Sequence, residues 1–300
     1  MDSRQSKQPL QATLHACRLT MSDGVALAAT VSGEHGQPAV ILLHGGGQTR
    51  HSWQGTVKTL GALGYHALAF DARGHGDSDW SARPDYSYDR LAEDLETVAS
   101  KMADAPVIIG ASMGGMTAMH AIGRHPTTLA RAMVLVDIAP RVDPKGLKRV
   151  NDFLNGYRDG FADLEEAADA VAAYNPHRPR PQNPRGLMKN LRLRDDGRLH
   201  WHWDPRFFRE RSDEQRERSA KRLLDMCLHI AIPALLVFGA QSDVVSTEGI
   251  EELRARLPQL EVGTVPGAGH MIAGDRNDAF NGAIMPFLER HAGLGDGQIA

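Results

Sequence analysis

Short apolar runs alternate with helix-like segments along most of this chain, and this alternation constrains the fold more than any other feature. The runs that indicate central strands span residues 39–43, 65–70, 107–110, 131–136 and 232–238. Runs that are apolar throughout are typical of parallel strands covered by helices on both faces. With a hairpin at residues 15–31 and a last strand at 261–265, the sequence predicts an α/β fold. We expect a mostly parallel sheet of about eight strands flanked by helices.

The alternation stops between residues 141 and 228 and resumes at residue 232. The intervening stretch is rich in charge, has helix-like patches and contains a proline-rich loop at residues 175–184. We therefore expect a core made of residues 1–140 and 229–300, with an inserted helical cap, or lid, at residues 141–228. A chain of 300 residues is long enough for one large domain with such an insertion.

A sharp turn is predicted where one of the central strands meets a helix-like stretch. Its pattern is Gly110-Ala111-Ser112-Met113-Gly114, a G-x-S-x-G sequence between a strand and a helix. A serine at the tip of such a turn has a strained backbone and an exposed hydroxyl. Because Gly110 and Gly114 lack a Cβ atom, the strand and the helix can approach closely on either side. The turn makes Ser112 the candidate nucleophile.

Every polar motif of the predicted core follows a strand, and in parallel sheets chemistry collects at the carboxyl ends of the strands. Besides the serine turn, these motifs are His44-Gly45-Gly46-Gly47, Asp71-x-Arg73-Gly74-x-Gly76-x-Ser78, an aspartate at residue 243 and Gly269-His270. In this order the motifs resemble the α/β-hydrolase superfamily along nearly the whole chain. The resemblance is to its cap-bearing branch of serine esterases, lactonases and cofactor-free haloperoxidase-like enzymes.

The resemblance implies a catalytic triad with Ser112 as nucleophile and His270 as base. A serine hydroxyl is a poor nucleophile without an adjacent base, and the glycine-rich loop before His270 could carry the imidazole to it. Asp243 is the first choice for the carboxylate that orients the imidazole, because it lies in the family's usual position. Asp137 is the alternative, because it ends the preceding strand, where some family members carry the acid. On this assignment, Asp243→Asn costs more activity than Asp137→Asn.

Acyl transfer also needs hydrogen-bond donors for the oxyanion that develops on the substrate. By family position, the backbone N–H groups of Met113 and Gly46 form the expected oxyanion hole, and Gly47 is a further candidate. The serine also separates this chain from haloalkane dehalogenases and epoxide hydrolases of the superfamily, which use aspartate at this turn.

Three tryptophans are candidates for the substrate pocket, and plain packing is the alternative for each. Trp201 and Trp203 alternate, so they share one face if the segment is extended. Trp53 follows the glycine-rich loop that contains Gly47, and both residues could border the pocket. The cap also has an arginine-rich segment at residues 177–198, which could steer an anionic substrate. A solvated surface with local salt bridges is the favoured interpretation of that segment.

We expect a cytoplasmic protein that acts on a small molecule, and the triad mechanism requires no metal or organic cofactor. The net charge of −3 and the pI near 6.5 give no reason to expect nucleic acid or an anionic membrane as a partner. The N-terminus lacks the apolar centre of a signal peptide, and no apolar run approaches the ~20 residues of a membrane span. Cys17 and Cys227 lack metal or redox spacing and are expected as reduced thiols. We expect a monomer or a homodimer.

These features together predict a serine hydrolase that cleaves a carboxylic ester or lactone through an acyl-enzyme. A haloperoxidase-like perhydrolase or a C–C bond hydrolase on the same triad is the alternative among enzymes. A non-catalytic small-molecule receptor on the hydrolase fold is the alternative from another class.

Overall fold

An eight-stranded sheet runs through the centre of the chain in the computed structural model, which describes residues 12–174, 180, 182–209, 211–269 and 277–293. Its spatial order is β1-β2-β4-β3-β5-β6-β9-β10. Only β2 pairs antiparallel with its neighbours, and every other pairing is parallel. The strands are β1 (His15–Thr20), β2 (Ala26–Ser32), β3 (Ala39–Leu43), β4 (His66–Phe70), β5 (Val107–Ala111), β6 (Ala132–Val136), β9 (Ala234–Gly239) and β10 (Leu260–Val265). The predicted sheet is confirmed.

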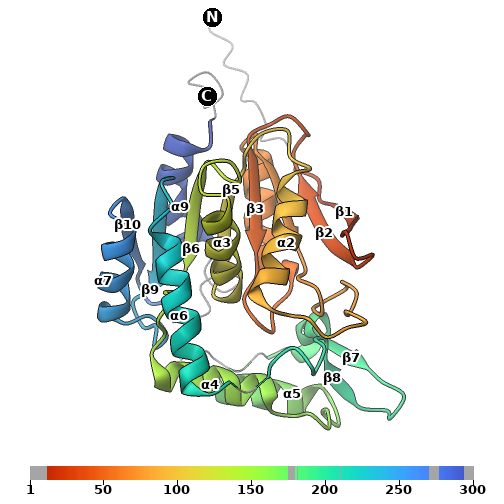
Figure 1. The fold of residues 1–300 in the computed structure, drawn as a ribbon. Helices are drawn as coiled ribbons and strands as arrows, with labels where there is room; N and C mark the ends of the chain where they lie inside the picture. Colours follow the sequence, from red (N-terminus) through yellow and green to blue (C-terminus); the bar gives the residue numbers. More distant parts are fainter. Residues whose placement is uncertain (1–11, 175–179, 181, 210, 270–276, 294–300) are drawn as a thin grey trace, which may run out of the picture.

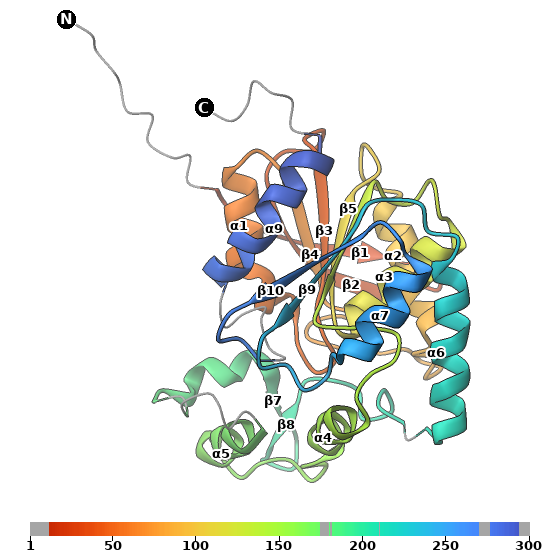
Figure 2. The same cartoon turned by 90° about the vertical axis from the view of Figure 1, so that its left-hand side faces the viewer.

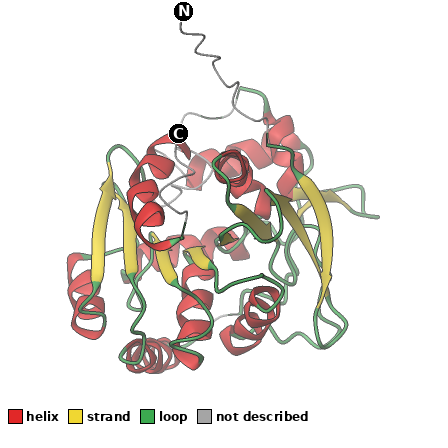
Figure 3. Cartoon of the chain, turned by 90° about the horizontal axis from the view of Figure 1, so that it is seen from above, coloured by secondary structure: helices red, strands yellow, loops and turns green. Residues whose placement is uncertain are grey.

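Helices cover both faces of the sheet, as Figures 2 and 3 show. One face carries the short η1 (Arg50–Trp53), α1 (Gln54–Ala62) and α9 (Asn277–His291), and the other carries α2 (Tyr88–Ala99), α3 (Met113–Arg124), α6 (Asp213–Cys227) and α7 (Thr247–Arg256). In α2, Leu91, Leu95 and Val98 lie on one face of the helix, which packs into the core. The Ser87 side chain caps the start of the helix by accepting a hydrogen bond from the Arg90 N–H. Each fully buried aliphatic side chain of this kind contributes about 1.5–3 kcal/mol.

The cap lies below the sheet in Figure 1 and has a small apolar core of its own, in which Leu154, Phe161, Trp201 and Trp203 are buried. Its elements are α4 (Pro144–Asn155), α5 (Leu164–Tyr174), the 3₁₀ helix η2 (Pro184–Asn190), and the two-stranded hairpin β7 (Leu191–Leu193) with β8 (Leu199–Trp201). The helical cap expected from the sequence therefore also contains a β hairpin. The signal was the Asp-Gly turn at Gly197, whose φ is +75°.

Helix α6 packs on the core, although the predicted cap extended to residue 228. Leu223 and Cys227 join the same apolar cluster as α3, and a Cβ added at Gly123 of α3 would lie 2.9 Å from Met226 Cβ. By packing, the inserted part ends before α6. Cys17 and Cys227 are both free thiols. Among the described helices, none combines the length and apolar character needed to cross a bilayer.

Candidate active site

Ser112 occupies the turn between β5 and α3 with a left-handed backbone, at φ 46° and ψ −112°. Such a conformation costs a non-glycine residue about 1–3 kcal/mol and is maintained by its surroundings. Here the Ser112 N–H donates to Val136 O at 3.0 Å, which ties the turn to β6. A Cβ at Gly110 would lie 2.5 Å from the Gly114 carbonyl carbon, and a Cβ at Gly114 would lie 2.6 Å from Leu43 Cβ. The two glycines are therefore required by close approach.

The glycine loop after β3 lies against the serine. A Cβ added at Gly45 would be 3.5 Å from Ser112 Cβ. The Gly47 N–H is already used, since it donates to His75 Nε2 at 3.2 Å. The N–H groups of Gly46 and Met113 donate to no other group within the described residues. Of the two glycines considered for the oxyanion hole, Gly46 is the one with an available donor.

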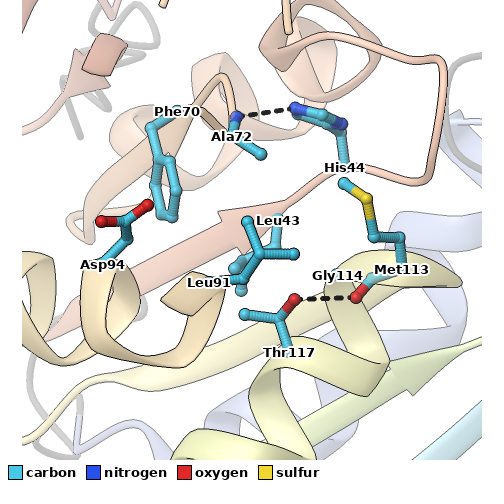
Figure 4. Close-up of a pocket in the computed structure, with 9 residues that line it drawn as sticks. All are labelled: Leu43, His44, Phe70, Ala72, Leu91, Asp94, Met113, Gly114 and Thr117. Carbon is cyan, nitrogen blue, oxygen red and sulfur yellow. Dashed lines mark hydrogen bonds between the residues drawn. The ribbon is translucent and has the colours of Figure 1, made fainter. Parts of the chain in front are cut away.

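His44 is hydrogen-bonded both to the glycine loop and to the loop that follows β4. Its Nε2 accepts from the Ala72 N–H at 2.9 Å, and its Nδ1 donates to Gly45 O at 2.8 Å. Figure 4 shows the ring directed at Ala72, with Met113 nearby, around a small cavity of about 10 Å³. One accepting and one donating nitrogen define the neutral tautomer that carries its proton on Nδ1.

Two further buried histidines, His75 and His202, also form hydrogen bonds with the glycine loop. His75 accepts from Gly47 at Nε2 and lies 3.4 Å from Arg73 O at Nδ1. His202, from the cap, accepts from the Gly76 N–H at 2.7 Å, and its Nε2 faces Gly47 O at 3.3 Å. A cap residue thus joins the glycine loop to the loop after β4.

The three rings form one cluster, with centroids 5.2 Å apart for His44 and His75 and 5.7 Å apart for His75 and His202. Burial disfavours the charged imidazolium and lowers the pKa of His44, and it lowers the pKa of His75 well below its usual value. Burial, together with the nearby His44, lowers the pKa of His202 to about 3. All three rings are therefore neutral hydrogen-bonding groups near pH 7.

The cap covers the glycine loop closely. A Cβ at Gly46 would lie 3.1 Å from a ring carbon of Phe208, and one at Gly47 would lie 2.5 Å from a methyl carbon of Leu154. Gly47 also has a positive φ of 72°, which favours glycine. Larger residues here would push the cap away from the serine.

Asp137 directly follows β6 and is 1% exposed. Its Oδ1 accepts from the Gly239 N–H at 3.0 Å, and its Oδ2 accepts from the Ser242 hydroxyl at 2.7 Å. Its backbone is left-handed, with φ 51°. A Cβ at Gly239 would lie 2.5 Å from Gly269 O. Gly239 therefore contacts both Asp137 and Gly269, the residue that directly precedes His270 in the chain. His270 itself lies outside the described residues.

Asp243 has a different environment. Its Oδ2 pairs with Arg149 of the cap helix α4, and its side chain is 36% exposed. Its carbonyl oxygen lies 2.1 Å from the position of a Cβ added at Gly146, so α4 packs directly on this loop. The described contacts of Asp243 thus connect the core to the cap.

A cavity of about 960 Å³ lies between the core and the cap, and Ser112, Met113 and Gly46 are on its wall. Trp201 and Trp203 also line it, stacked with centroids 5.0 Å apart and an interplanar angle of 12°. Gly47 lines it as well. Trp53 does not line it: the ring is fully buried against Phe280 on the far face of the sheet. The pocket role considered for Trp53 is therefore corrected to core packing.

In the arginine-rich cap segment, three of the described basic side chains are held by carboxylates or backbone carbonyls. Arg180 binds Glu165 and Asp169, Arg192 binds Asp77, and Arg198 binds the carbonyls of Asp159 and Gly160. None of the described basic residues in this segment lines the cavity. This arrangement agrees with the solvated surface that the sequence favoured.

The remaining charged motif braces the loops around the site. Asp71 pairs with Arg50 and accepts from the Asp77 N–H at 2.9 Å. Arg73 is buried and pairs with Asp94 and Asp23. Within the described chain, no group of three His, Cys, Asp or Glu side chains is placed to hold a metal ion.

The sheet order, the serine turn and the glycine loop define the class of protein, an α/β hydrolase. Residues 38–276 match the family described as alpha/beta hydrolase fold, and the chain belongs to this family. Esterase Rv0045c of Mycobacterium tuberculosis is 31% identical over 261 residues, covering 84% of this chain and 83% of the relative. The sn-1-specific diacylglycerol lipase ABHD11 of Mus musculus is 26% identical over 275 residues, covering 86% and 83%.

Solved structures agree with this assignment. A structure of the M. tuberculosis esterase Rv0045c matches with a TM-score of 0.74 and 28% identity, covering 94% of this chain and 93% of the other. The structure of E-2-(acetamidomethylene)succinate hydrolase matches in fold, with a TM-score of 0.77 at 22% identity, covering 92% and 100%. The chain is thus a serine hydrolase of the alpha/beta fold.

Proposed function

We propose that this enzyme cleaves a carboxylic ester or lactone through an acyl-enzyme on Ser112. The observation that carries the proposal is the left-handed Ser112 at the β5–α3 turn, on the wall of a large cavity. The named activities of the relatives, an esterase and a diacylglycerol lipase, support an ester as substrate. The available Gly46 and Met113 amides, both on the same wall, support acyl chemistry.

In the proposed mechanism, Ser112 Oγ attacks the substrate carbonyl while His270 takes the hydroxyl proton. The Gly46 and Met113 N–H groups stabilise the oxyanion, and each such donor is worth about 3–4 kcal/mol. His270 then gives its proton to the leaving alcohol, and an acyl-enzyme remains. Water, deprotonated by His270, attacks the acyl carbonyl and releases the acid.

For the acid we propose Asp137 in place of Asp243, which reverses the order favoured by the sequence. Support comes from burial, because a carboxylate withdrawn from water acts more strongly on an adjacent imidazolium. Support also comes from Gly239, which contacts both Asp137 and the segment ending at Gly269. The ion pair between Asp243 and Arg149 gives Asp243 a structural partner on the cap.

A fluorophosphonate probe tests the nucleophile directly. We expect stoichiometric labelling of the folded enzyme, mapped by peptide mass spectrometry to Ser112, and loss of labelling in Ser112→Ala. Labelling is then compared with turnover of p-nitrophenyl esters and of lactones. An unlabelled Ser112 in a folded protein that still cleaves esters would contradict the mechanism.

A further inference from the structure

Among the described residues, six arginines line the cavity, against one lining carboxylate, Asp85. They are Arg206, Arg209, Arg211, Arg216, Arg218 and Arg222. They come from the segment that leaves the cap and from α6, so they lie outside the arginine-rich segment that the sequence analysis singled out. Asp85 itself lies 3.9 Å from Arg90, which is not a lining residue.

Three of the six arginines have carboxylate partners. Arg206 binds the buried Asp204, which also accepts from Tyr86. The other two pairs are Arg216 with Asp213 and Arg222 with Asp89. In each of these pairs the carboxylate offsets most of the positive charge of its arginine.

The other three arginines make no ion pair within the described residues. Among the residues that the structure describes, no carboxylate lies within ion-pair distance of Arg209 or Arg218. Arg211 lies over the ring of Tyr88, 5.9 Å from its centroid. Guanidinium groups stay protonated across the whole working pH range. The wall of the cavity therefore keeps a local excess of positive charge.

The packing of α6 decides which of its side chains border the cavity. From α6, residues 215, 216, 218, 219, 220 and 222 line the cavity. Leu223 and Cys227 lie on an adjacent stripe of the helix and pack in the core cluster with α3. This apolar packing fixes the rotation of α6, and the exposed Arg218 borders both this cavity and an open hollow on the outer surface. Figure 1 shows α6 running beside the core down to the cap.

The cap wall of the same cavity is apolar and aromatic. It carries Phe153, Leu154, Trp201, Trp203 and Phe208. One wall is thus suited to a hydrocarbon or an aromatic group, and another to negative charge. Neutral ester substrates would use only the first of these.

We propose that the substrate is an ester whose acyl or alcohol part carries an anionic group, a carboxylate or a phosphate, bound by Arg209, Arg211 and Arg218. This proposal rests on the esterase function proposed above and narrows its substrate class. Arginine forms paired hydrogen bonds to both kinds of anion. The three side chains are exposed, so their effect is screened by salt and is modest for each one.

The test compares a charged ester with its neutral counterpart of equal length. The first pair is the p-nitrophenyl monoester of adipic acid with a free carboxylate, and the same compound as its methyl ester. A third ester, p-nitrophenyl 6-phosphonooxyhexanoate, replaces the carboxylate by phosphate. We expect kcat/KM of the native enzyme to be at least about tenfold higher for one of the charged esters than for the methyl ester. The preference should fall as sodium chloride rises from about 20 to about 500 mM.

The matched variants are Arg211→Gln/Arg218→Gln and, as a control, Lys58→Gln/Arg254→Gln. The control residues are exposed, make no ion pair within the described residues and do not line the cavity. We expect the first pair to reduce the charge preference to less than about threefold while kcat/KM for the methyl ester changes little. The control should retain both the preference and its salt dependence. If the double variant does not fold, Arg209→Gln and the salt dependence of the native enzyme carry the test.

The possible outcomes distinguish a failure of the anionic-substrate proposal from a failure of the esterase proposal on which it rests. Equal or faster cleavage of the methyl ester by the native enzyme would overturn the anionic substrate and leave the esterase proposal intact. Equal losses in both double variants would also overturn it, because general charge and not the cavity wall would be responsible. Cleavage of no ester by an enzyme that fluorophosphonate does not label would contradict the esterase proposal itself.

Discussion

The core wall and the cap wall of the cavity are held in place by different means. On the core wall, backbone geometry sets the site: Ser112 has a left-handed φ, and Gly110 and Gly114 leave no room for a Cβ atom. On the cap wall, Trp201 and Trp203 are placed by side-chain packing, with their rings stacked on each other. We infer that the core wall carries the reaction, while the cap wall and α6 help to select the substrate.

His202 connects the cap to the core by hydrogen bonds. It belongs to the cap, yet its ring nitrogens engage Gly76 and Gly47 of the core loops. The carbonyl of Gly47 and the N–H of Gly76 therefore have this partner only when the cap is in position. We infer that cap docking and the shape of the oxyanion loop are coupled.

The largest expected effect belongs to the core wall. Ser112→Ala should lower kcat by at least about 10,000-fold, since loss of a triad nucleophile removes the covalent route. Steady-state turnover of p-nitrophenyl butyrate measures it, with circular dichroism as the check on folding. Relief of the left-handed strain is not expected, because alanine also disfavours φ 46°. Residual activity within a hundredfold of native would place the nucleophile elsewhere.

The second prediction tests which carboxylate belongs to the core machinery. Asp137→Asn should lower kcat by about 1,000- to 10,000-fold, the size seen when a triad acid loses its charge. Asp243→Asn should cost less than about fivefold, because it removes a partly exposed ion pair with Arg149. Both variants are near-isosteric, so each serves as the control for the other. The reverse ranking would restore Asp243 as the acid.

The third prediction concerns the neutral histidines that join the two walls. The pKa of folded His202 is about 3, below the ~6.5 of an unfolded histidine, so the unfolded chain binds more protons between these values. Its contribution to stability is full above about pH 6.5 and is lost as the pH falls towards 3, at up to about 1.4 kcal/mol per pH unit. His44 and His75 act in the same direction.

Urea unfolding at pH 7, 6 and 5 measures this loss. His202→Gln keeps an acceptor and a donor without titrating, so its stability should fall less steeply with acid. The exposed His229→Gln is the control and should keep the native slope. A native enzyme whose stability does not change between pH 7 and 5 would show that these rings are protonated without cost.

Much of the core wall could be predicted from the sequence because it obeys local rules. Apolar runs gave β3 at Ala39–Leu43 and most of the other central strands to within a residue or two. The G-x-S-x-G pattern predicted a strained turn, and Ser112 has that backbone. These signals lie within a few consecutive residues, so no tertiary information was needed.

The cap and the acid resisted prediction because their placement depends on contacts distant in sequence. Trp53 and Trp203 were equal candidates for the pocket, yet only Trp203 lines it, because η1 carries Trp53 to the opposite face of the sheet. The environment of Asp243 is decided by Arg149 on α4, almost a hundred residues earlier. Arg216, Arg218 and Arg222 line the cavity from α6, whose packing on α3 the charge pattern alone did not reveal.

The smallest expected effect tests the cap wall on its own. Trp203 stacks on Trp201 and lines the cavity, so Trp203→Leu removes apolar contact area without touching Ser112. We expect kcat/KM for esters with six- to eight-carbon acyl chains to fall about 5- to 10-fold, equivalent to about 1 kcal/mol of lost apolar contact. Acetate ester turnover should hardly change. Trp80→Leu, at a tryptophan that is 41% exposed and does not line the cavity, is the control. An equal loss for acetate and longer esters would mean that the cap wall helps to shape the reaction centre, and the division between the two walls would then fail.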